Sequence, residues 1–294
     1  MNTEPLKVVT FNFLPIAYDL VTQWIHDQGH QHLLAVTTPG PKSRPTPAYK
    51  GIVTNAPRNV DILVTTKLRG VATPLIRALQ PDLIVCFSFP YRITPELCAI
   101  PRLGAVNLHP AVLPAYRGPN VFRSFYEGWP EFGATTHWIA EEYDTGNILS
   151  QKAAPLPEEV TPENIYSIWG PLISETLAEG LERAIAGDPG TPQDDSQASY
   201  AAPFTEAETW LDLSEPQRVI QRKVTALNFG PETLAKVRVN NESFAVTAVS
   251  LSPPQTSTAQ PGTCLERNEE TLLVQAADGP IRLQIKPMTG GNES

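Results

Sequence analysis

Residues 104–120 read Gly-Ala-Val-Asn-Leu-His-Pro-Ala-Val-Leu-Pro-Ala-Tyr-Arg-Gly-Pro-Asn, and this stretch decides the fold that we predict. Its first half is typical of a strand, and Pro110 ends the hydrogen-bonding ladder because proline has no N–H to donate. Asn107 and His109 are two residues apart, so their side chains project to the same face of the strand. The pattern therefore predicts an amide that can donate to a developing oxyanion beside an imidazole that can move a proton near neutral pH.

A second stretch supplies a carboxylate. Residues 132–151 contain two strand-like runs joined by an acidic loop, and Asp144-Thr145-Gly146 lies at the turn. An amide, an imidazole and a carboxylate are the groups that proton transfer at an acyl carbon requires. Taken one at a time, Asn107 would be a turn residue and His109 a buried structural histidine. Their combination with Asp144 favours a catalytic site.

These residues resemble the catalytic signature of the folate-dependent formyltransferases. The signature consists of Asn-x-His on a strand, a Leu-Pro-x-x-(Arg or Lys)-Gly loop, and a histidine followed after six residues by Asp-x-Gly. The matching residues here are Asn107 and His109, Leu113-Pro114 with Arg117-Gly118, and His137 with Asp144 and Gly146. The region is similar to both methionyl-tRNA formyltransferase and glycinamide ribonucleotide formyltransferase.

The resemblance implies formyl transfer from 10-formyltetrahydrofolate to a primary amine, with no metal. Asn107 would donate to the oxyanion, His109 would transfer the proton, and Asp144 would set the state of the histidine and order a water. By the same resemblance, a folate site made largely of backbone would lie in the segments 89–94 and 138–144.

The residues that the resemblance assigns to folate binding are Phe89, Arg92, Ile93, Thr94, His137, Ala140 and Glu141. Those that it assigns to acceptor binding are Arg117, Gly118 and Pro119. Two alternatives stay open at this point. His137 can be a structural histidine on a strand face, and Arg117-Gly118 can be a simple turn.

Composition limits the class of protein. The chain has 294 residues, enough for a main domain and a smaller second one, and no run approaches the ~20 apolar residues of a membrane span. Its three cysteines, Cys86, Cys98 and Cys264, form no Cys-x-x-Cys pair, so neither a disulfide framework nor a zinc site is indicated. The N-terminus has no apolar region typical of a signal peptide. We therefore expect a cytoplasmic protein.

Periodicity predicts an α/β fold. Apolar strands alternate with amphipathic helices, which indicates a Rossmann-like, mostly parallel sheet with helices on both faces and a ligand crevice where the 104–109 strand ends. We expect strands at 7–13, 32–37, 61–65, 82–87 and 104–109, and helices at 16–28, 70–80, 120–127 and 161–187. Asn120 and Thr161 are the expected N-caps of the last two helices, and residues 39–57 are expected to form a loop.

A second domain follows a polar segment rich in Gly, Pro, Asp, Gln and Ser. We expect a helix at 214–227 and strands at 233–239, 243–251, 272–276 and 281–285, with Asn240-Asn241 at a hairpin turn. Short strands of this kind suggest a small OB-like β-barrel, similar to the C-terminal domain of methionyl-tRNA formyltransferase. The predicted organisation is a formyltransferase domain at 1–190, a linker at 191–207 and a barrel-like domain at 208–294.

The acceptor amine is less clearly indicated. The chain has Phe13-Leu14-Pro15 where methionyl-tRNA formyltransferases have Gly-Thr-Pro, and only Lys42, Arg44 and Lys50 where they have a basic insertion. Its net charge of −9 disfavours binding to a polyanion. We therefore expect a small-molecule or peptide-type amine as acceptor. The alternatives are methionyl-tRNA, and a formyltetrahydrofolate hydrolase or non-catalytic folate binder.

One feature supports the tRNA alternative. A basic stripe could be assembled from side chains on the 214–227 helix and the 233–239 strand. Its members would be Arg218, Arg222, Lys223, Lys236 and Arg238. If these charges converged and were free, they could neutralise phosphates despite the acidic total.

Overall fold

The structure is a computed structural model that describes residues 4–40, 47–230, 232–251 and 259–288. Lys42 and Arg44, named above as candidate tRNA contacts, lie outside the described residues. The chain divides into two compact units. The first comprises Met1–Pro119, Gly133–Ala153 and Gly170–Tyr200, and the second comprises Asn120–Phe132, Ala154–Trp169 and Ala201–Ser294.

A seven-stranded sheet with the order β3-β2-β1-β4-β5-β6-β7 is the centre of the N-terminal part, among the residues that the structure describes. Its strands are β1 (Lys7–Asn12), β2 (Gln31–Thr37), β3 (Asp61–Val64), β4 (Leu83–Phe87), β5 (Ala105–His109), β6 (Glu131–Trp138) and β7 (Ile148–Pro155). The strands β1 to β5 pair in parallel, and β6 is antiparallel to β5. The predicted mostly parallel sheet is confirmed.

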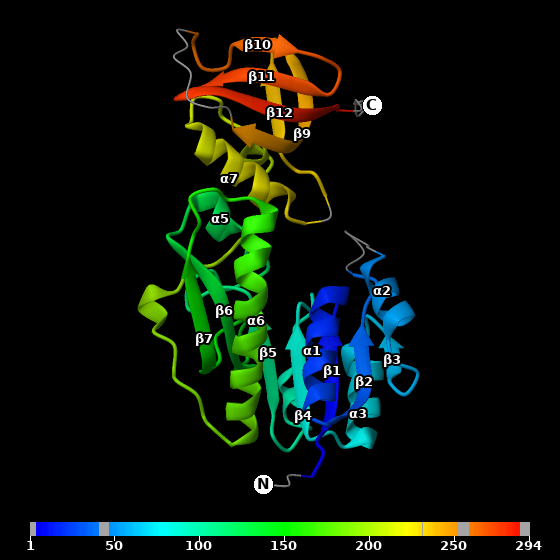
Figure 1. The fold of residues 1–294 in the computed structure, drawn as a ribbon. Helices are drawn as coiled ribbons and strands as arrows, with labels where there is room; N and C mark the ends of the chain where they lie inside the picture. The colour runs from blue at the N-terminus through cyan, green and yellow to red at the C-terminus, as the bar shows by residue number, and fades with distance from the viewer. Residues whose placement is uncertain (1–3, 41–46, 231, 252–258, 289–294) are drawn as a thin grey trace. The chain divides into compact units, whose positions relative to one another are not determined.

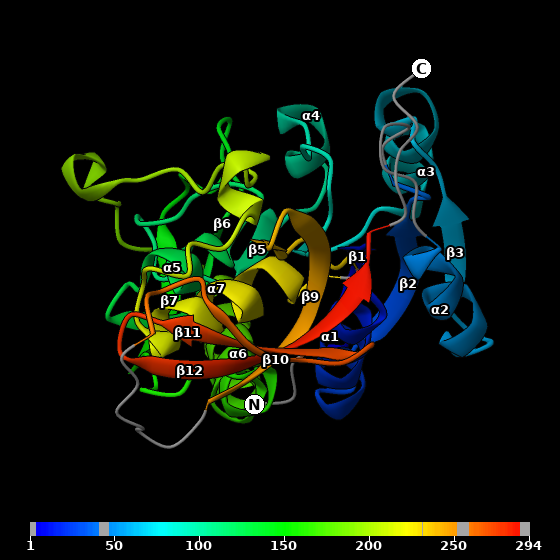
Figure 2. The same cartoon turned by 90° about the horizontal axis from the view of Figure 1, so that it is seen from above.

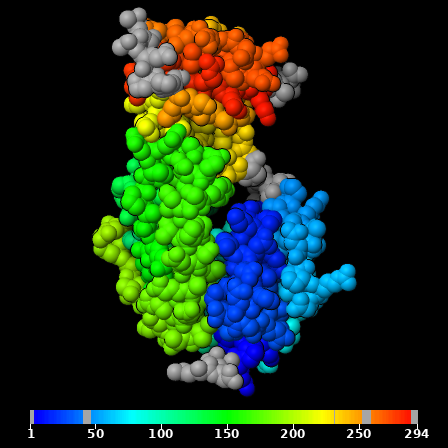
Figure 3. All heavy atoms as spheres, in the orientation of Figure 1, coloured from blue at the N-terminus to red at the C-terminus, as the bar shows by residue number. Residues whose placement is uncertain are grey.

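Helices cover both faces of this sheet (Figures 1 and 2). They are α1 (Pro15–Asp27), α2 (Ala48–Asn55), α3 (Thr73–Leu79), α4 (Pro95–Cys98) and the second half of α6 (Pro162–Ile185), with a π-helical turn at Leu68–Ala72 before α3. The short helix α5 (Arg123–Glu127) belongs to the second compact unit. Apolar side chains of α1 and of the second half of α6 pack on one face, whereas those of α3 and α4 pack on the other. The outer sides of α1 and α6 are seen in Figure 3.

Strand register sets the geometry of the site. The register pairs Asn107 of β5 with Cys86 of β4 on one side and with His137 of β6 on the other. Because directly opposed residues in a sheet have neighbouring side chains, the Asn-x-His strand and the histidine of the second motif are brought together by backbone pairing alone.

The C-terminal part contains α7 (Gln217–Asn228) and an antiparallel sheet with the strand order β10-β11-β12-β9-β8. Its strands are β8 (Lys236–Val239), β9 (Glu242–Leu251), β10 (Cys264–Arg267), β11 (Thr271–Ala276) and β12 (Gly279–Pro287). The sheet curls around an apolar core to which α7 contributes Ile220, Val224 and Leu227. The expected small barrel is confirmed as a curled, partly closed sheet.

Several local predictions hold. Asn240 and Asn241 both have positive φ angles, 52° and 64°, as a tight hairpin turn requires. Thr161 caps α6, because its Oγ1 accepts a hydrogen bond from the Asn164 N–H at 3.2 Å.

Three local predictions were wrong. The expected loop at 39–57 contains α2, the strand β10 was not expected, and Asn120 does not cap α5, whose N-cap position is held by Phe122. The side-chain amide of Asn120 instead donates to the Ala202 carbonyl at 3.0 Å. A tertiary partner has taken the side chain that local sequence assigned to a cap. The boundaries at 190 and 208 remain predictions about independent folding.

Candidate active site

Four polar side chains converge at the end of β5. Asn107 and His109 lie on β5, His137 lies opposite on β6, and Asp144 lies in the turn between β6 and β7. The side chains of His109, His137 and Asp144 are 6%, 2% and 10% exposed, so the group is nearly removed from water. The structure thus brings together the residues of both sequence motifs.

The hydrogen bonds of His137 define its tautomer. Its Nδ1 lies 2.8 Å from the Trp138 carbonyl, which can only accept, so Nδ1 carries the proton. Its Nε2 then accepts from Asn107 Nδ2 at 3.1 Å. The second N–H of the Asn107 amide donates to Asp144 Oδ1 at 3.3 Å. His137, assigned above to folate binding, therefore fixes the orientation of the amide.

His109 is held between a carbonyl and a carboxylate. Its Nε2 donates to the Tyr116 carbonyl at 2.8 Å, and its Nδ1 lies 3.6 Å from Asp144 Oδ2. Burial, the largest influence, lowers the pKa of His109 below its usual value, and the Asp144 carboxylate and the Tyr116 carbonyl oppose this only in part. Burial therefore favours the neutral imidazole, and its Nδ1 lies on the side of the Asp144 carboxylate.

Asp144 is an ionised carboxylate in a nearly dry site. Burial alone would raise its pKa, but His109, His137 and the Gly118 N–H outweigh burial and hold the pKa of Asp144 well below its usual range. The Gly118 N–H donates to Oδ2 at 2.9 Å. The residue adopts a left-handed φ of 56°, and its position in a tight turn is consistent with that angle.

The Asp-x-Gly motif requires glycine at its third position for a steric reason. A Cβ at Gly146 would lie 1.7 Å from the Trp138 carbonyl oxygen, so no larger residue fits this backbone path. The close approach folds the turn back against β6 and places the Asp144 carboxylate beside the histidines.

The two segments expected to form the folate site also meet. Arg92 Nη2 lies 3.7 Å from Glu141 Oε1 across them. Ile93 is buried in the core, and Thr94 caps α4 by accepting from the Leu97 N–H at 3.3 Å. Phe89 packs edge-on against Phe11 with ring centroids 5.2 Å apart. These three side chains are used for packing and capping, and the folate site assigned to these segments remains a prediction.

The residues expected to bind the acceptor lie on the loop that follows β5. Arg117 donates to Gln193 and Asp195, Gly118 binds Asp144, and Pro119 is exposed. Sequence reasoning did not identify Tyr116 or Gln193. Tyr116 acts through its backbone carbonyl, which side-chain identity cannot reveal, and Gln193 lies in the segment interpreted as a linker.

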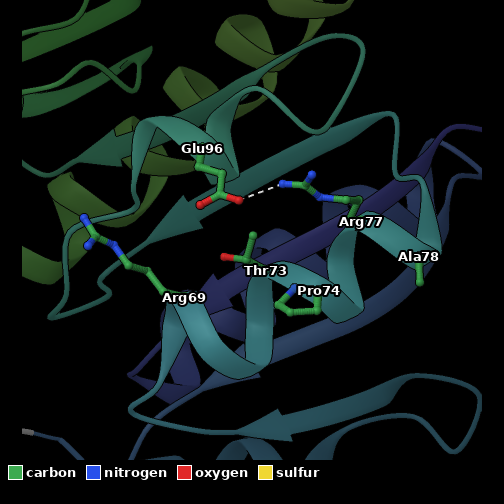
Figure 4. A pocket seen from close by; sticks show the side chains of 6 residues that line it. All are labelled: Arg69, Thr73, Pro74, Arg77, Ala78 and Glu96. Carbon is green, nitrogen blue, oxygen red and sulfur yellow. Dashed lines mark hydrogen bonds and ion pairs between the residues drawn. The ribbon is translucent and has the colours of Figure 1, made fainter.

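A separate surface hollow of about 400 Å³ lies at α3 and α4 (Figure 4). Its lining includes Arg69, Thr73 and Glu96, and Arg77 Nη2 lies 2.7 Å from Glu96 Oε1. None of the expected site residues lines it.

Within the described ranges, no group of three or more His, Cys, Asp or Glu side chains is arranged to hold a metal ion. In the same part of the chain, no helix combines the length and apolarity needed to cross a membrane.

Comparison with known proteins identifies the family. Residues 41–170 match the family described as formyl transferase, and residues 203–293 match the formyl transferase C-terminal domain. Methionyl-tRNA formyltransferase of Moorella thermoacetica is 32% identical over 208 residues, which cover 70% of this chain and 66% of that protein, slightly under two thirds of its length. The same enzyme of Pseudomonas syringae pv. syringae is 28% identical over 301 residues, covering 98% of this chain and 92% of that protein.

A solved structure shows the same fold. HypX from Aquifex aeolicus, in complex with tetrahydrofolic acid, superposes with a TM-score of 0.68 at 18% identity, over 95% of this chain and 43% of that one. The chain belongs to the folate-dependent formyltransferase family. The resemblance identified in the sequence is confirmed.

Proposed function

We propose that the protein transfers a formyl group from 10-formyltetrahydrofolate to a primary amine. The observation that carries the proposal is the convergence of Asn107, His109 and Asp144 in one buried cluster of a formyltransferase-family chain. A neutral imidazole beside an ionised carboxylate is a suitable proton-transfer pair, because the carboxylate stabilises the imidazolium that forms.

Each residue has a role that follows from its contacts. When bound, the folate supplies an activated formyl carbon on its N10. Asn107 would turn one N–H from Asp144 to the formyl oxygen as negative charge develops there, and the 3.3 Å contact with Asp144 is the longer of its two hydrogen bonds. His137 would keep the amide in place, because its Nε2 can only accept from Asn107.

Proton transfer completes the reaction. The amine nitrogen forms a bond to the formyl carbon, the bond from that carbon to N10 breaks, and one proton moves from the amine to N10. His109 would receive this proton and return it, directly or through a water ordered by Asp144. No redox partner is needed, and the chemistry uses groups that the site contains.

For the acceptor, we infer that methionyl-tRNA is the first candidate. The full-length alignment with the Pseudomonas enzyme and the match to the C-terminal family domain support this alternative over the small amine that sequence patterns favoured. The aminoacyl end of such a tRNA carries the primary amine that the proposed reaction needs.

A small amine remains the second candidate, because the basic side chains that could contact tRNA are largely paired. Arg218, Lys223 and Lys236 lie 3.0, 2.6 and 2.7 Å from glutamate oxygens. Arg222 is partly buried, and the Arg238 guanidinium lies over the Trp210 ring at 5.1 Å from its centroid. Few free charges are left on this surface to neutralise phosphates.

The test is an acceptor-dependent release of tetrahydrofolate. Purified protein would be mixed with 10-formyltetrahydrofolate and either methionyl-tRNA, uncharged tRNA or a panel of small primary amines, and folate absorbance would be followed. Release with methionyl-tRNA and not with uncharged tRNA is expected. Release only with a small amine would select the second candidate, release with no acceptor would indicate hydrolysis, and no release would reject the proposal.

A further inference from the structure

The segment interpreted above as a linker runs along the catalytic loop. The Arg117 N–H donates to the Ser199 carbonyl at 3.0 Å, and the Tyr116 N–H donates to Ser199 Oγ at 2.9 Å. The Ser199 N–H in turn donates to the Pro114 carbonyl at 3.3 Å. Tyr200 forms a parallel bridge with Arg117. Ser199 and Tyr200, at the end of the segment 193–200, are thus paired with the loop whose Tyr116 carbonyl and Gly118 N–H hold His109 and Asp144.

Gln193 begins this segment and uses all of its hydrogen-bonding capacity. Its Nε2 donates to the carbonyls of Asp144 at 2.8 Å and Gly146 at 2.7 Å. Its Oε1 accepts from Arg117 Nε at 3.1 Å and from Arg117 Nη2 at 2.7 Å. An amide has two N–H donors and two acceptor lone pairs, so the side chain is fully satisfied by this one arrangement.

These contacts close a ring around the carboxylate. The Asp144 side chain accepts from Gly118, Gly118 follows Arg117, Arg117 donates to Gln193, and Gln193 donates to the Asp144 carbonyl. The ring therefore fixes both ends of Asp144, the backbone through Gln193 and the carboxylate through the loop. The Arg117 side chain is only 12% exposed, so its guanidinium is oriented within the protein and not by solvent.

We propose that Gln193 is a positioning residue for formyl transfer. It holds the Asp144-Thr145-Gly146 turn and the Arg117-Gly118 loop in the geometry that places Asp144 against His109. The inference rests on the proposed function, but its structural part concerns the chain alone. A displacement of about 1 Å in a catalytic group can cost ~10²-fold in rate, so loss of this amide is expected to lower kcat by ~10- to 10²-fold.

Two variants separate the contacts. Gln193→Leu removes both donors and both acceptors. Gln193→Glu keeps acceptors for Arg117 but cannot donate to the Asp144 and Gly146 carbonyls at neutral pH. Gln197→Leu is the matched control, because Gln197 lies in the same segment, is exposed, and its side chain donates to Asp194 Oδ2 at 2.9 Å, away from the loop and the turn.

The first measurement does not depend on activity. Hydrogen exchange is measured on the full chain, and in both Gln193 variants it is expected to accelerate in peptides covering residues 113–120 and 142–147. The smallest acceleration is expected in the 113–120 peptide of Gln193→Glu, which keeps the acceptors for Arg117. No acceleration is expected in Gln197→Leu. Unchanged exchange in both Gln193 variants would overturn the inference, whether or not the protein transfers formyl groups.

The second measurement uses the acceptor found with the wild-type enzyme. We expect kcat to fall in both Gln193 variants, while the KM for 10-formyltetrahydrofolate and the melting temperature stay close to those of Gln197→Leu. A fall in melting temperature with unchanged kcat would mean a purely structural role and would also overturn the inference. A wild-type enzyme with no transfer activity would reject the proposed function before any variant is measured.

Discussion

Asn107 serves two purposes at the residue scale. Its amide N–H groups bind His137 Nε2 and Asp144 Oδ1, which fixes the amide plane and leaves no choice of orientation, since a flipped amide would turn its oxygen to the carboxylate. The same N–H groups are the donors that an oxyanion needs. If Asn107 acts as proposed, the N–H that Asp144 accepts has to change its partner from the carboxylate to the oxyanion, while the hydrogen bond to His137 keeps the amide in place.

The first prediction concerns catalysis. His109→Ala and Asp144→Ala are each expected to lower kcat by ~10²–10⁴-fold, because each removes one half of the proton-transfer pair. Steady-state kinetics and a folate-binding titration measure this, with His26→Ala, a histidine whose side chain is 85% exposed, as the control. Retention of more than about a tenth of the wild-type kcat by either variant would contradict the assignment.

The second prediction concerns a histidine away from the site. His32 is 7% exposed, and its Nε2 lies 3.0 Å from Thr10 Oγ1. Burial lowers the pKa of His32 to about 4, whereas its value in the unfolded chain is ~6.5. Between these two pH values the unfolded state binds about one more proton at His32 than the folded state does. The contribution of His32 to the free energy of unfolding is therefore complete above the upper pH value and declines as the pH falls.

As the pH is lowered through this interval, the free energy of unfolding of the wild type is expected to fall. In His32→Gln it is expected to fall less, because glutamine binds no proton. Urea unfolding at several pH values gives the slope for the variant, the wild type and the exposed control His26→Gln. If the free energy of unfolding had the same pH slope in the wild type and in His32→Gln, the His32 ring would not stay neutral as the pH is lowered.

The candidate catalytic residues were predictable because their side chains occur at a spacing that resembles the family signature. Asn107, His109 and Asp144 were found in this way, and the structure brings them within hydrogen-bond or ion-pair distance. Gln193 had no such signal, since a glutamine among Pro, Asp and Ser resembles any polar segment. Its contacts depend on long-range folding that a single sequence does not encode locally.

At the scale of elements, buried strands were more predictable than surface segments. The apolar runs of β1, β4 and β5 gave the parallel sheet, because strands covered on both faces must be apolar throughout. The helix α2 was hidden by flanking prolines and buries only Ile52, so its apolar periodicity is weak. The strand β10 is mostly exposed and pairs only at the edge of its sheet, which leaves little pattern to detect.

The third prediction tests how α6 packs on the sheet. A Cβ at Gly180 would lie 2.4 Å from Cβ and Cγ2 of Thr136 on β6, and Thr136 is fully buried with its Oγ1 bonded to the Thr176 carbonyl at 2.9 Å. Gly180→Ala is therefore expected to destabilise the protein by ~1–3 kcal/mol through overpacking, despite the better helix propensity of alanine.

The control lies in the same helix. Gly170 has no atom within 4 Å of the position of an added Cβ, although Pro171 follows it and limits any gain in helix propensity. Gly170→Ala is expected to change stability by less than ~0.5 kcal/mol in thermal or urea unfolding. Equal effects of the two substitutions would contradict the close packing of α6 on β6.

At the scale of the whole molecule, the compact units do not follow a single cut in the chain. Residues 120–132 and 154–169 belong to the unit that contains the C-terminal residues. Within that unit the Phe229 ring stacks on Phe122 at 4.7 Å between centroids and contacts Trp169 at 6.1 Å. Such aromatic pairs contribute ~0.5–1.5 kcal/mol each beyond the area that they bury.

The fourth prediction follows from this packing. A fragment of residues 1–207 loses Phe229 and α7, so we expect it to unfold at a lower temperature than the full chain and to bind a hydrophobic dye. Thermal unfolding and dye fluorescence measure both effects. Cooperative unfolding at the temperature of the full chain, without dye binding, would instead support the domain boundaries at 190 and 208.

The last prediction concerns affinity for tRNA. Log K for a nucleic acid falls by ~0.9 per neutralised duplex phosphate for each tenfold rise in salt, so the slope counts the free basic side chains at the interface. With three of the five candidate side chains paired to glutamates, we expect a shallow slope and a Kd in the non-specific range of ~10⁻⁴–10⁻⁶ M.

If methionyl-tRNA is the acceptor, recognition would then depend on its aminoacyl end. Filter binding of methionyl-tRNA and uncharged tRNA at two salt concentrations measures this. Sub-micromolar affinity with a steep slope for both tRNAs would show that the glutamates release these side chains to the phosphate backbone.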